Sequence, residues 1–194
     1  MLVDDGGADF EGEVWDGSDV PVEHAIRGFY SVMLSVPALD RIDPILTQVL
    51  QFRQGQQVQS PGGLNVTVYE TGEGGPGREL WVVEEPDQPL ARLGAGGVHH
   101  VAFRVANGEE QRYWRDRVGG AGLYVSPIVN RFYFQSIYFR ISNGILFEIA
   151  TDGPGFATDE ALDSLGEKLA LPPFLEPQRE SIEANLKPIV MKAQ

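Results

Sequence analysis

The stretch GGVHHVAFRV, residues 96–105, places two adjacent histidines inside an apolar run. The alternation of its side chains predicts a β-strand over residues 97–105. Successive residues of a strand face opposite sides, so His99 would share one face with Val101, and His100 the other face with Ala102. From a regular strand, therefore, at most one of the two imidazoles can bind a given metal ion.

A carboxylate occupies a similar setting further along the chain. Glu148 lies in the middle of the apolar stretch GILFEIAT, residues 144–151. Burying an ionised carboxylate without a partner is very costly, so Glu148 requires a metal ion, a cation or a proton nearby. A single strand histidine or glutamate is more often an ordinary core or surface residue, and the two gain weight only because they occur together.

The first half of the chain has a clear order of elements. Its patterns predict a strand over 25–36 and a helix over 39–52. Two further strands, over 64–70 and 78–85, are joined by the glycine-rich turn 71–77. This turn lacks the Lys-Ser/Thr of a phosphate-binding loop and joins two strands, so we interpret it as a turn only.

The same order then repeats. A strand over 97–105 is followed by a helix over 107–122 and by a hairpin over 136–151 with a Ser-Asn-Gly turn. Aligning Val36 with Val105 gives an offset of 69 residues. The sequence therefore predicts an α+β fold of tandem β-α-β-β-β modules.

This order divides the chain into four parts. They are an acidic arm or linker at 1–24, a first module at 25–90, a second module at 95–154 and a C-terminal helical tail at 155–194. In the arm, Phe10 and Trp15 are candidate anchors. In the tail, amphipathic patterns predict helices over 159–171 and 179–189.

Composition excludes several classes of function. The 194 residues carry a net charge of −13, which argues against nucleic acid or an anionic membrane as a partner. There is no cysteine, so disulfides, thiolate zinc sites and thiol catalysis are excluded. No apolar run reaches the length of a membrane span, and the first residues lack the basic region of a signal peptide. We expect a cytoplasmic protein.

The repeated order, with HHVAFRV in one strand and NGILFEIATDGPGF around another, resembles the vicinal oxygen chelate superfamily. This is the glyoxalase/bleomycin resistance/dioxygenase fold, in which modules close a cup around one divalent metal ion. The tail, with LGEKLALPPFLEPQRESIEANLKPI, is similar to that of the hydroquinone-type ring-cleaving dioxygenases of this superfamily. The resemblance covers nearly all of residues 20–190.

The resemblance implies a role for each of five residues. His100 and Glu148 match the metal ligands, and His99 matches a histidine near the substrate. Arg131 and Tyr138 match an arginine and a tyrosine that line the aromatic pocket, and His99, Arg131 and Tyr138 would be catalytic. The implied metal is Fe(II), with Mn(II), Zn(II) or Ni(II) as alternatives. A site of two histidines and one carboxylate leaves positions open for O₂ and a phenolate.

The first module departs from this pattern. Under the 69-residue offset, Ser31 stands where His100 stands, and we place Val82 at the position of Glu148. His24 precedes the first strand, and we interpret it as a linker residue. The chain thus offers one imidazole and one carboxylate. In the family the missing histidine belongs to an N-terminal half, so we expect this chain to be a C-terminal half that is a poor dioxygenase alone.

Three functions remain open. The first is an Fe(II)-dependent ring-cleaving dioxygenase, or its C-terminal half, acting on a hydroquinone-like substrate and O₂. The second is a glyoxalase-like lyase or isomerase, and the third is a non-enzymatic small-molecule binding module. We also expect a homodimer, or else a separate N-terminal half as partner, because Ile137, Phe139 and Ile141 would otherwise lack cover.

Overall fold

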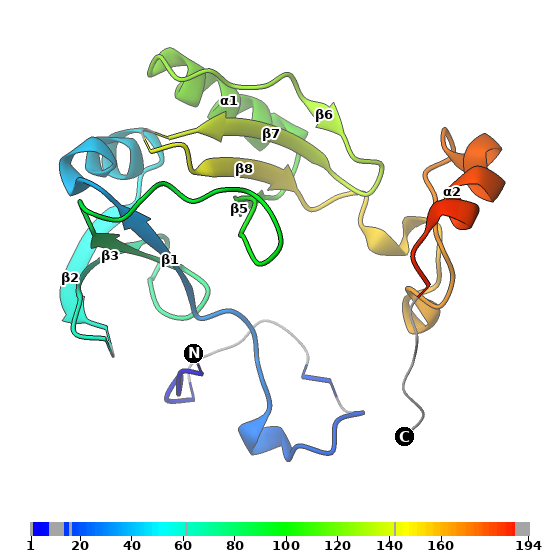
Figure 1. Ribbon diagram of the computed structural model, residues 1–194, viewed down its shortest axis with the longest axis horizontal. Coiled ribbons are helices and arrows are strands. Elements are labelled where there is room, and N and C mark those ends of the chain that lie inside the picture. Colours follow the sequence, from blue (N-terminus) through cyan, green and yellow to red (C-terminus); the bar gives the residue numbers. More distant parts are fainter. Residues whose placement is uncertain (1, 8–13, 16, 61, 142, 189–194) are drawn as a thin grey trace.

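The computed structural model describes residues 2–7, 14–15, 17–60, 62–141 and 143–188. Two four-stranded sheets form its body (Figure 1). The first sheet has the order β1-β4-β3-β2 and the second has the order β5-β8-β7-β6. In each sheet the first and last strands are parallel neighbours, and the other pairs are antiparallel. The identical order confirms the predicted fold of tandem β-α-β-β-β modules.

The strands of the first sheet are β1 (Ser31–Val36), β2 (Arg53–Gln59), β3 (Asn65–Glu70) and β4 (Glu79–Glu84). Those of the second are β5 (Val101–Val105), β6 (Val129–Asn130), β7 (Gln135–Arg140) and β8 (Leu146–Thr151). Strand β2 was absent from the sequence interpretation because its glutamine-rich stretch RQGQQVQ has too few apolar residues to alternate. The strand predicted over 25–36 begins only at Ser31, after a 3₁₀ turn, η1 (Val22–His24).

Helix α1 (Gly108–Gly120) covers the second sheet. It begins after Asn107, whose side chain accepts hydrogen bonds from the backbone N–H groups of Glu109 and Glu110. The helix predicted over 39–52 is instead a 3₁₀ turn, η2 (Leu39–Arg41), and a π-helix, η3 (Ile45–Val49). Pro44 precedes η3 in a helical conformation, and the N–H of Leu50 donates to the carbonyl oxygen of Ile45, the five-residue spacing of a π-helix.

The tail contains less helix than its pattern predicts. Residues 159–171, all of which the structure describes, form only the 3₁₀ turn η5 (Leu162–Ser164). Gly166 follows with φ of 81°, a left-handed conformation that cannot continue a right-handed helix. Beyond it, α2 (Arg179–Asn185) is shorter than the predicted 179–189. The remaining 3₁₀ turns of the tail are η4 (Phe156–Thr158) and η6 (Glu176–Gln178).

One continuous core joins the two sheets. It includes Phe52 of the first repeat, whose ring lies 5.7 Å from that of Phe103 in the second. Ile137, Phe139 and Ile141 are buried in this core together with Val118 of α1. The expectation that these three side chains lack cover was wrong, because α1 packs on the same face of the sheet. The domain boundary between residues 90 and 95 stays a prediction.

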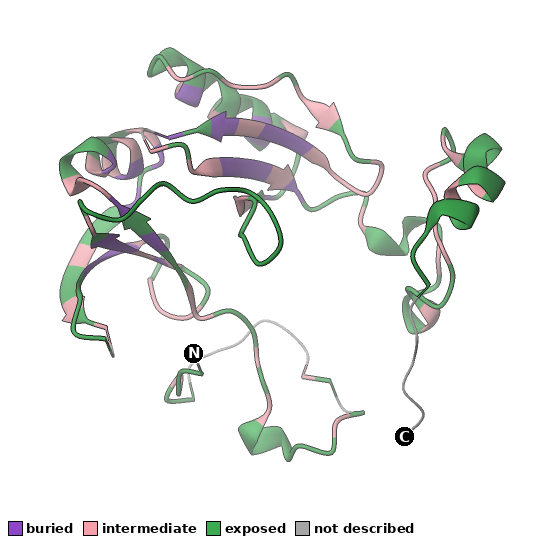
Figure 2. Ribbon diagram, viewed as in Figure 1, coloured by how far each residue is buried: buried purple, intermediate pink, exposed green. Residues whose placement is uncertain are grey.

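The N-terminal arm and the tail leave much of their surface open (Figure 2). Trp15 is 73% exposed and so is not an anchor, and Phe10 lies outside the described residues. In the portion of the chain that is described, no helix is both long and apolar enough to cross a bilayer.

A single side chain ties α1 to the first repeat. Arg117 donates from Nε to the carbonyl oxygen of Val49 and from Nη2 to that of Gln48, both at 2.6 Å. These carbonyls lie at the end of η3, where backbone acceptors lack helical partners. Arg117, on the helix of the second module, thus supplies hydrogen-bond donors to the carbonyl groups at the end of η3 in the first module.

We therefore expect Arg117→Ala to lower the free energy of unfolding by about 2 kcal/mol, since hydrogen bonds from a charged group to two carbonyls are lost. Urea unfolding followed by circular dichroism measures the change. Arg115→Ala, on the exposed side of the same helix, is the matched control and should change stability little. Equal effects of the two substitutions would contradict a bridging role for Arg117.

Candidate functional site

The centre of the candidate site is the carboxylate of Glu148 on β8. Its residue is 3% exposed, and both carboxylate oxygens have partners. Oε1 accepts hydrogen bonds from the Ser136 hydroxyl and, at 3.0 Å, from the Tyr138 hydroxyl. Oε2 lies 2.7 Å from Nε2 of His100. The cost of burying this carboxylate is thus offset by hydrogen bonds from three side chains.

His100 lies just before β5, which begins at Val101. Its side chain is 35% exposed, and its Nδ1 is 2.9 Å from Nδ1 of His99. The prediction that the two imidazoles lie on opposite faces assumed a strand over 97–105, and outside the strand that alternation does not apply. His99 instead contacts the ring nitrogen of His100 that is remote from Glu148. One of the two Nδ1 atoms must carry the proton between them.

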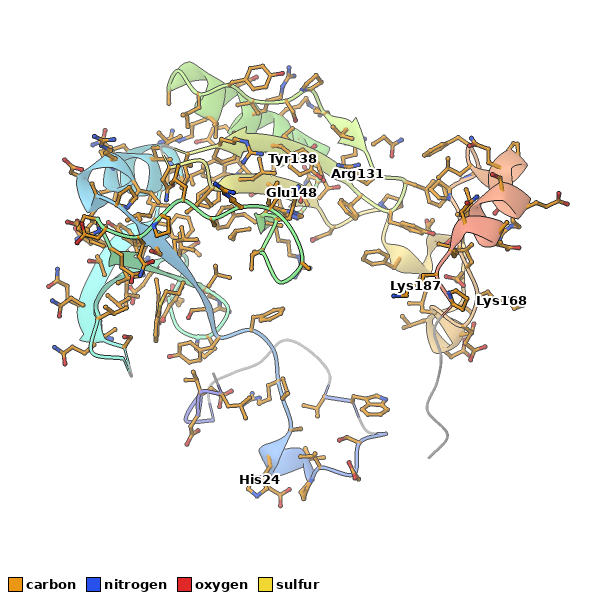
Figure 3. The ribbon with its side chains drawn as sticks, in the orientation of Figure 1. His24, Arg131, Tyr138, Glu148, Lys168 and Lys187 are labelled. Carbon is orange, nitrogen blue, oxygen red and sulfur yellow. The ribbon has the colours of Figure 1, made fainter. Side chains whose placement is uncertain are left out.

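Tyr138 and Arg131 extend the hydrogen bonds away from Glu148 (Figure 3). Tyr138 pairs directly with Glu148 across β7 and β8. Arg131 donates to the Tyr138 hydroxyl from Nε at 3.2 Å and from Nη2 at 3.1 Å. Because a guanidinium has no acceptor, the tyrosine oxygen accepts from Arg131 and its own proton is directed to Glu148.

The structure therefore brings together all five residues that the sequence singled out, while their roles stay predictions. Sequence reasoning missed Ser136, which is fully buried on β7 two residues before Tyr138. Period-two spacing places Ser136 and Tyr138 on one face of β7, and this spacing was the signal that could have found it. His24 lies at the far end of the N-terminal segment in Figure 3, away from Glu148.

The pair of His100 and Glu148 suits a divalent metal ion. Such ions bind imidazole nitrogen and carboxylate oxygen at about 2.0–2.2 Å, so one ion can contact two atoms that are 2.7 Å apart. Within the described ranges, no group of three or more His, Cys, Asp or Glu side chains could hold a metal ion. The described His, Cys, Asp and Glu residues therefore supply two candidate ligands here and no third.

In the first sheet, the position that corresponds to Glu148 holds an apolar side chain. Met33 pairs with Trp81 as Ala102 pairs with Glu148, so Trp81 is the counterpart of Glu148. The assignment of Val82 to that position was wrong, because the offset between β4 and β8 is two residues shorter than that between β1 and β5. The conclusion that the first module offers no metal ligand there is unchanged.

Several proteins of known sequence are similar to this chain. The Bacillus subtilis protein named "putative ring-cleaving dioxygenase MhqA" is 46% identical over 172 residues, which are 89% of this chain and 54% of that protein. A second B. subtilis protein, MhqO, is 36% identical over 94% of this chain and 56% of its own length. The chlorohydroquinone/hydroquinone 1,2-dioxygenase of Sphingobium indicum is 34% identical, over 92% of this chain and 55% of that enzyme. No protein-family model matches the chain.

Solved structures agree with these similarities. A B. subtilis protein described as a "putative dioxygenase" superposes with a TM-score of 0.79 at 35% identity, covering 95% of this chain and 57% of that one. A glyoxalase/bleomycin resistance protein/dioxygenase domain from Frankia gives a TM-score of 0.56 at 17% identity, over 68% of this chain and 96% of that domain. The chain spans about half the length of the curated relatives it matches.

We expect Glu148→Ala and His100→Ala each to abolish measurable binding of Co(II), since either substitution removes one of the two candidate ligands that the chain supplies. Titration followed by the visible absorption of bound Co(II) measures the loss. His24→Ala is the control with an exposed histidine remote from the site, and it should bind as the unsubstituted chain does. Retention of metal by Glu148→Ala would show that Glu148 is not a ligand.

Proposed function

We propose that this chain, which has the vicinal oxygen chelate fold and is homologous to ring-cleaving dioxygenases over about half of their length, carries the metal-binding cup of such an enzyme. The substrate class would be hydroquinone-like aromatics, with O₂ as co-substrate and Fe(II) as the metal. The observation that carries the proposal is the buried Glu148 carboxylate, held 2.7 Å from His100 on a sheet face with Tyr138 and Arg131.

Each residue has a task that its contacts support. His100 and Glu148 would hold the metal ion, and Fe(II) when bound supplies the chemistry that brings O₂ and a phenolate together. Tyr138 keeps its proton directed at Glu148 Oε1 while Arg131 is bonded to its oxygen. Arg131 is exposed, so its other guanidinium N–H groups can donate to an anionic substrate oxygen.

A glyoxalase-like lyase or isomerase is less well supported. That chemistry draws metal ligands from both modules of a cup, and here the positions in the first sheet hold Ser31 and Trp81. A metal-free binding module remains the other alternative. It accounts less well for a buried carboxylate beside an imidazole, because these are the side-chain types that bind divalent metal ions.

A third metal ligand, and the residues that cover the metal site, would come from another polypeptide chain. The described residues of the chain offer only two candidate ligands at this site, His100 and Glu148. We propose that a second copy of the chain supplies this cover, which would bring a second His100 and Glu148 to the site. A separate N-terminal half is the alternative partner.

We expect hydroquinone to change the visible spectrum of the Co(II)-loaded chain, and Arg131→Ala to weaken this response at least tenfold by removing donors to the substrate oxygen. In parallel, the Fe(II)-loaded chain should consume O₂ with hydroquinone only slowly, because a two-ligand site is incomplete. Arg140→Ala, on the exposed end of β7, is the control for loss of positive charge. A hydroquinone response that survives Arg131→Ala in full would contradict the proposed substrate site.

We expect sedimentation equilibrium to give the mass of a dimer, with a metal content that falls in His100→Ala. Apolar side chains that are exposed in the single chain, such as Phe29 at 91% and Val98 at 82%, are the physical reason for association. A monomer, or a dimer whose metal content is the same in His100→Ala, would rule out a site shared between two copies. Rapid O₂ consumption by a monomer with one Fe(II) would also refute the need for a third ligand from elsewhere.

A further inference from the structure

Ser136 contacts the candidate metal ligand from inside the sheet. It is fully buried on β7 and pairs with Ala150 of β8, one position beyond Glu148 on the same face. That hydroxyl donates to Glu148 Oε1.

The two carboxylate oxygens of Glu148 have different hydrogen-bond partners. Oε1 accepts from Ser136 and from Tyr138, and two donors fill the two lone pairs of a carboxylate oxygen. Oε2 accepts from neither hydroxyl and faces Nε2 of His100. The two hydroxyls thus fix which oxygen faces the imidazole and hold the plane of the carboxylate.

The first sheet provides an internal comparison. Val68 pairs with Trp81 as Tyr138 pairs with Glu148, and Val66 pairs with Val83 as Ser136 pairs with Ala150. Where tryptophan replaces the carboxylate, valines therefore replace both hydroxyl residues. The architecture itself has no need of a hydroxyl at this position, because Val66 is as buried as Ser136.

We propose that Ser136 is a positioning residue that holds Glu148 so that it binds the metal ion through Oε2 alone. Its hydroxyl donates to Oε1 from within the sheet, and the residue has no exposed surface. Tyr138 can then leave Oε1 during a reaction without freeing the carboxylate to rotate. This inference rests on the proposed function, since it assigns the support of the proposed metal ligand.

The test is Co(II) titration of Ser136→Ala, with Ser136→Thr as the variant that keeps a hydroxyl. Loss of a partner that supports a metal ligand typically costs about 10–100-fold in metal affinity, and we expect Ser136→Ala to fall in this range. The visible spectrum of bound Co(II) should also change, because the carboxylate is free to reorient. Ser136→Thr should restore both the affinity and the spectrum.

Val66→Ala is the matched control, because it alters the equivalent buried position of the first sheet. It should lower thermal stability and leave Co(II) affinity unchanged. An affinity in Ser136→Ala within twofold of the unsubstituted chain would overturn the inference, as would an equal loss of affinity in Val66→Ala. If Glu148→Ala retains metal, the proposed function itself fails. If Glu148→Ala loses metal while Ser136→Ala keeps it, only the role of Ser136 fails.

Discussion

The buried carboxylate of Glu148 is the constraint around which the second module is arranged. A carboxylate that is 3% exposed must be surrounded by donors, and here they come from both sides of its strand. Strand β7 supplies two hydroxyls through Ser136 and Tyr138, and the segment entering β5 supplies the imidazole of His100. The strand order β5-β8-β7 is what makes this possible, because it places the carboxylate on the central strand of the three.

The two faces of each sheet differ in how far they are alike between the repeats. Both sheets use one face for the shared core, in which Tyr69, Leu80, Ile137 and Ile149 are buried. The opposite face is free to differ, and it does so as a set: hydroxyls and a carboxylate in the second sheet, valines and a tryptophan in the first. Changing only one member of the polar set would leave a buried polar group without its partner, which costs more than replacing them together.

The sequence predicted the fold because each module has a strong local signal. The order of apolar runs, helical pattern and strand pair occurs twice, and HHV and Glu148 mark the second repeat. Three features could not be read in this way. Strand β2 is too polar to show apolar alternation, and η3 replaces a regular helix. The loops of the two repeats differ in length, so a constant offset of 69 residues does not align Trp81 with Glu148. The contact of Ser136 with Glu148 depends on strand pairing, which a single sequence does not specify.

The candidate site is covered on the Oε1 side of Glu148 and exposed on the side of His100. A further ligand would therefore approach from the side of His100. Ser136 and Tyr138 close the Oε1 side of the carboxylate from within the sheet. His99 contacts Nδ1 of His100, the ring nitrogen that is remote from Glu148. What remains accessible is the flank of the imidazole, since the His100 side chain is 35% exposed and that of Glu148 only 4%. Under the proposed function, a third ligand and a substrate would both approach along this flank, and the partner that covers the site would then set how much room the substrate has.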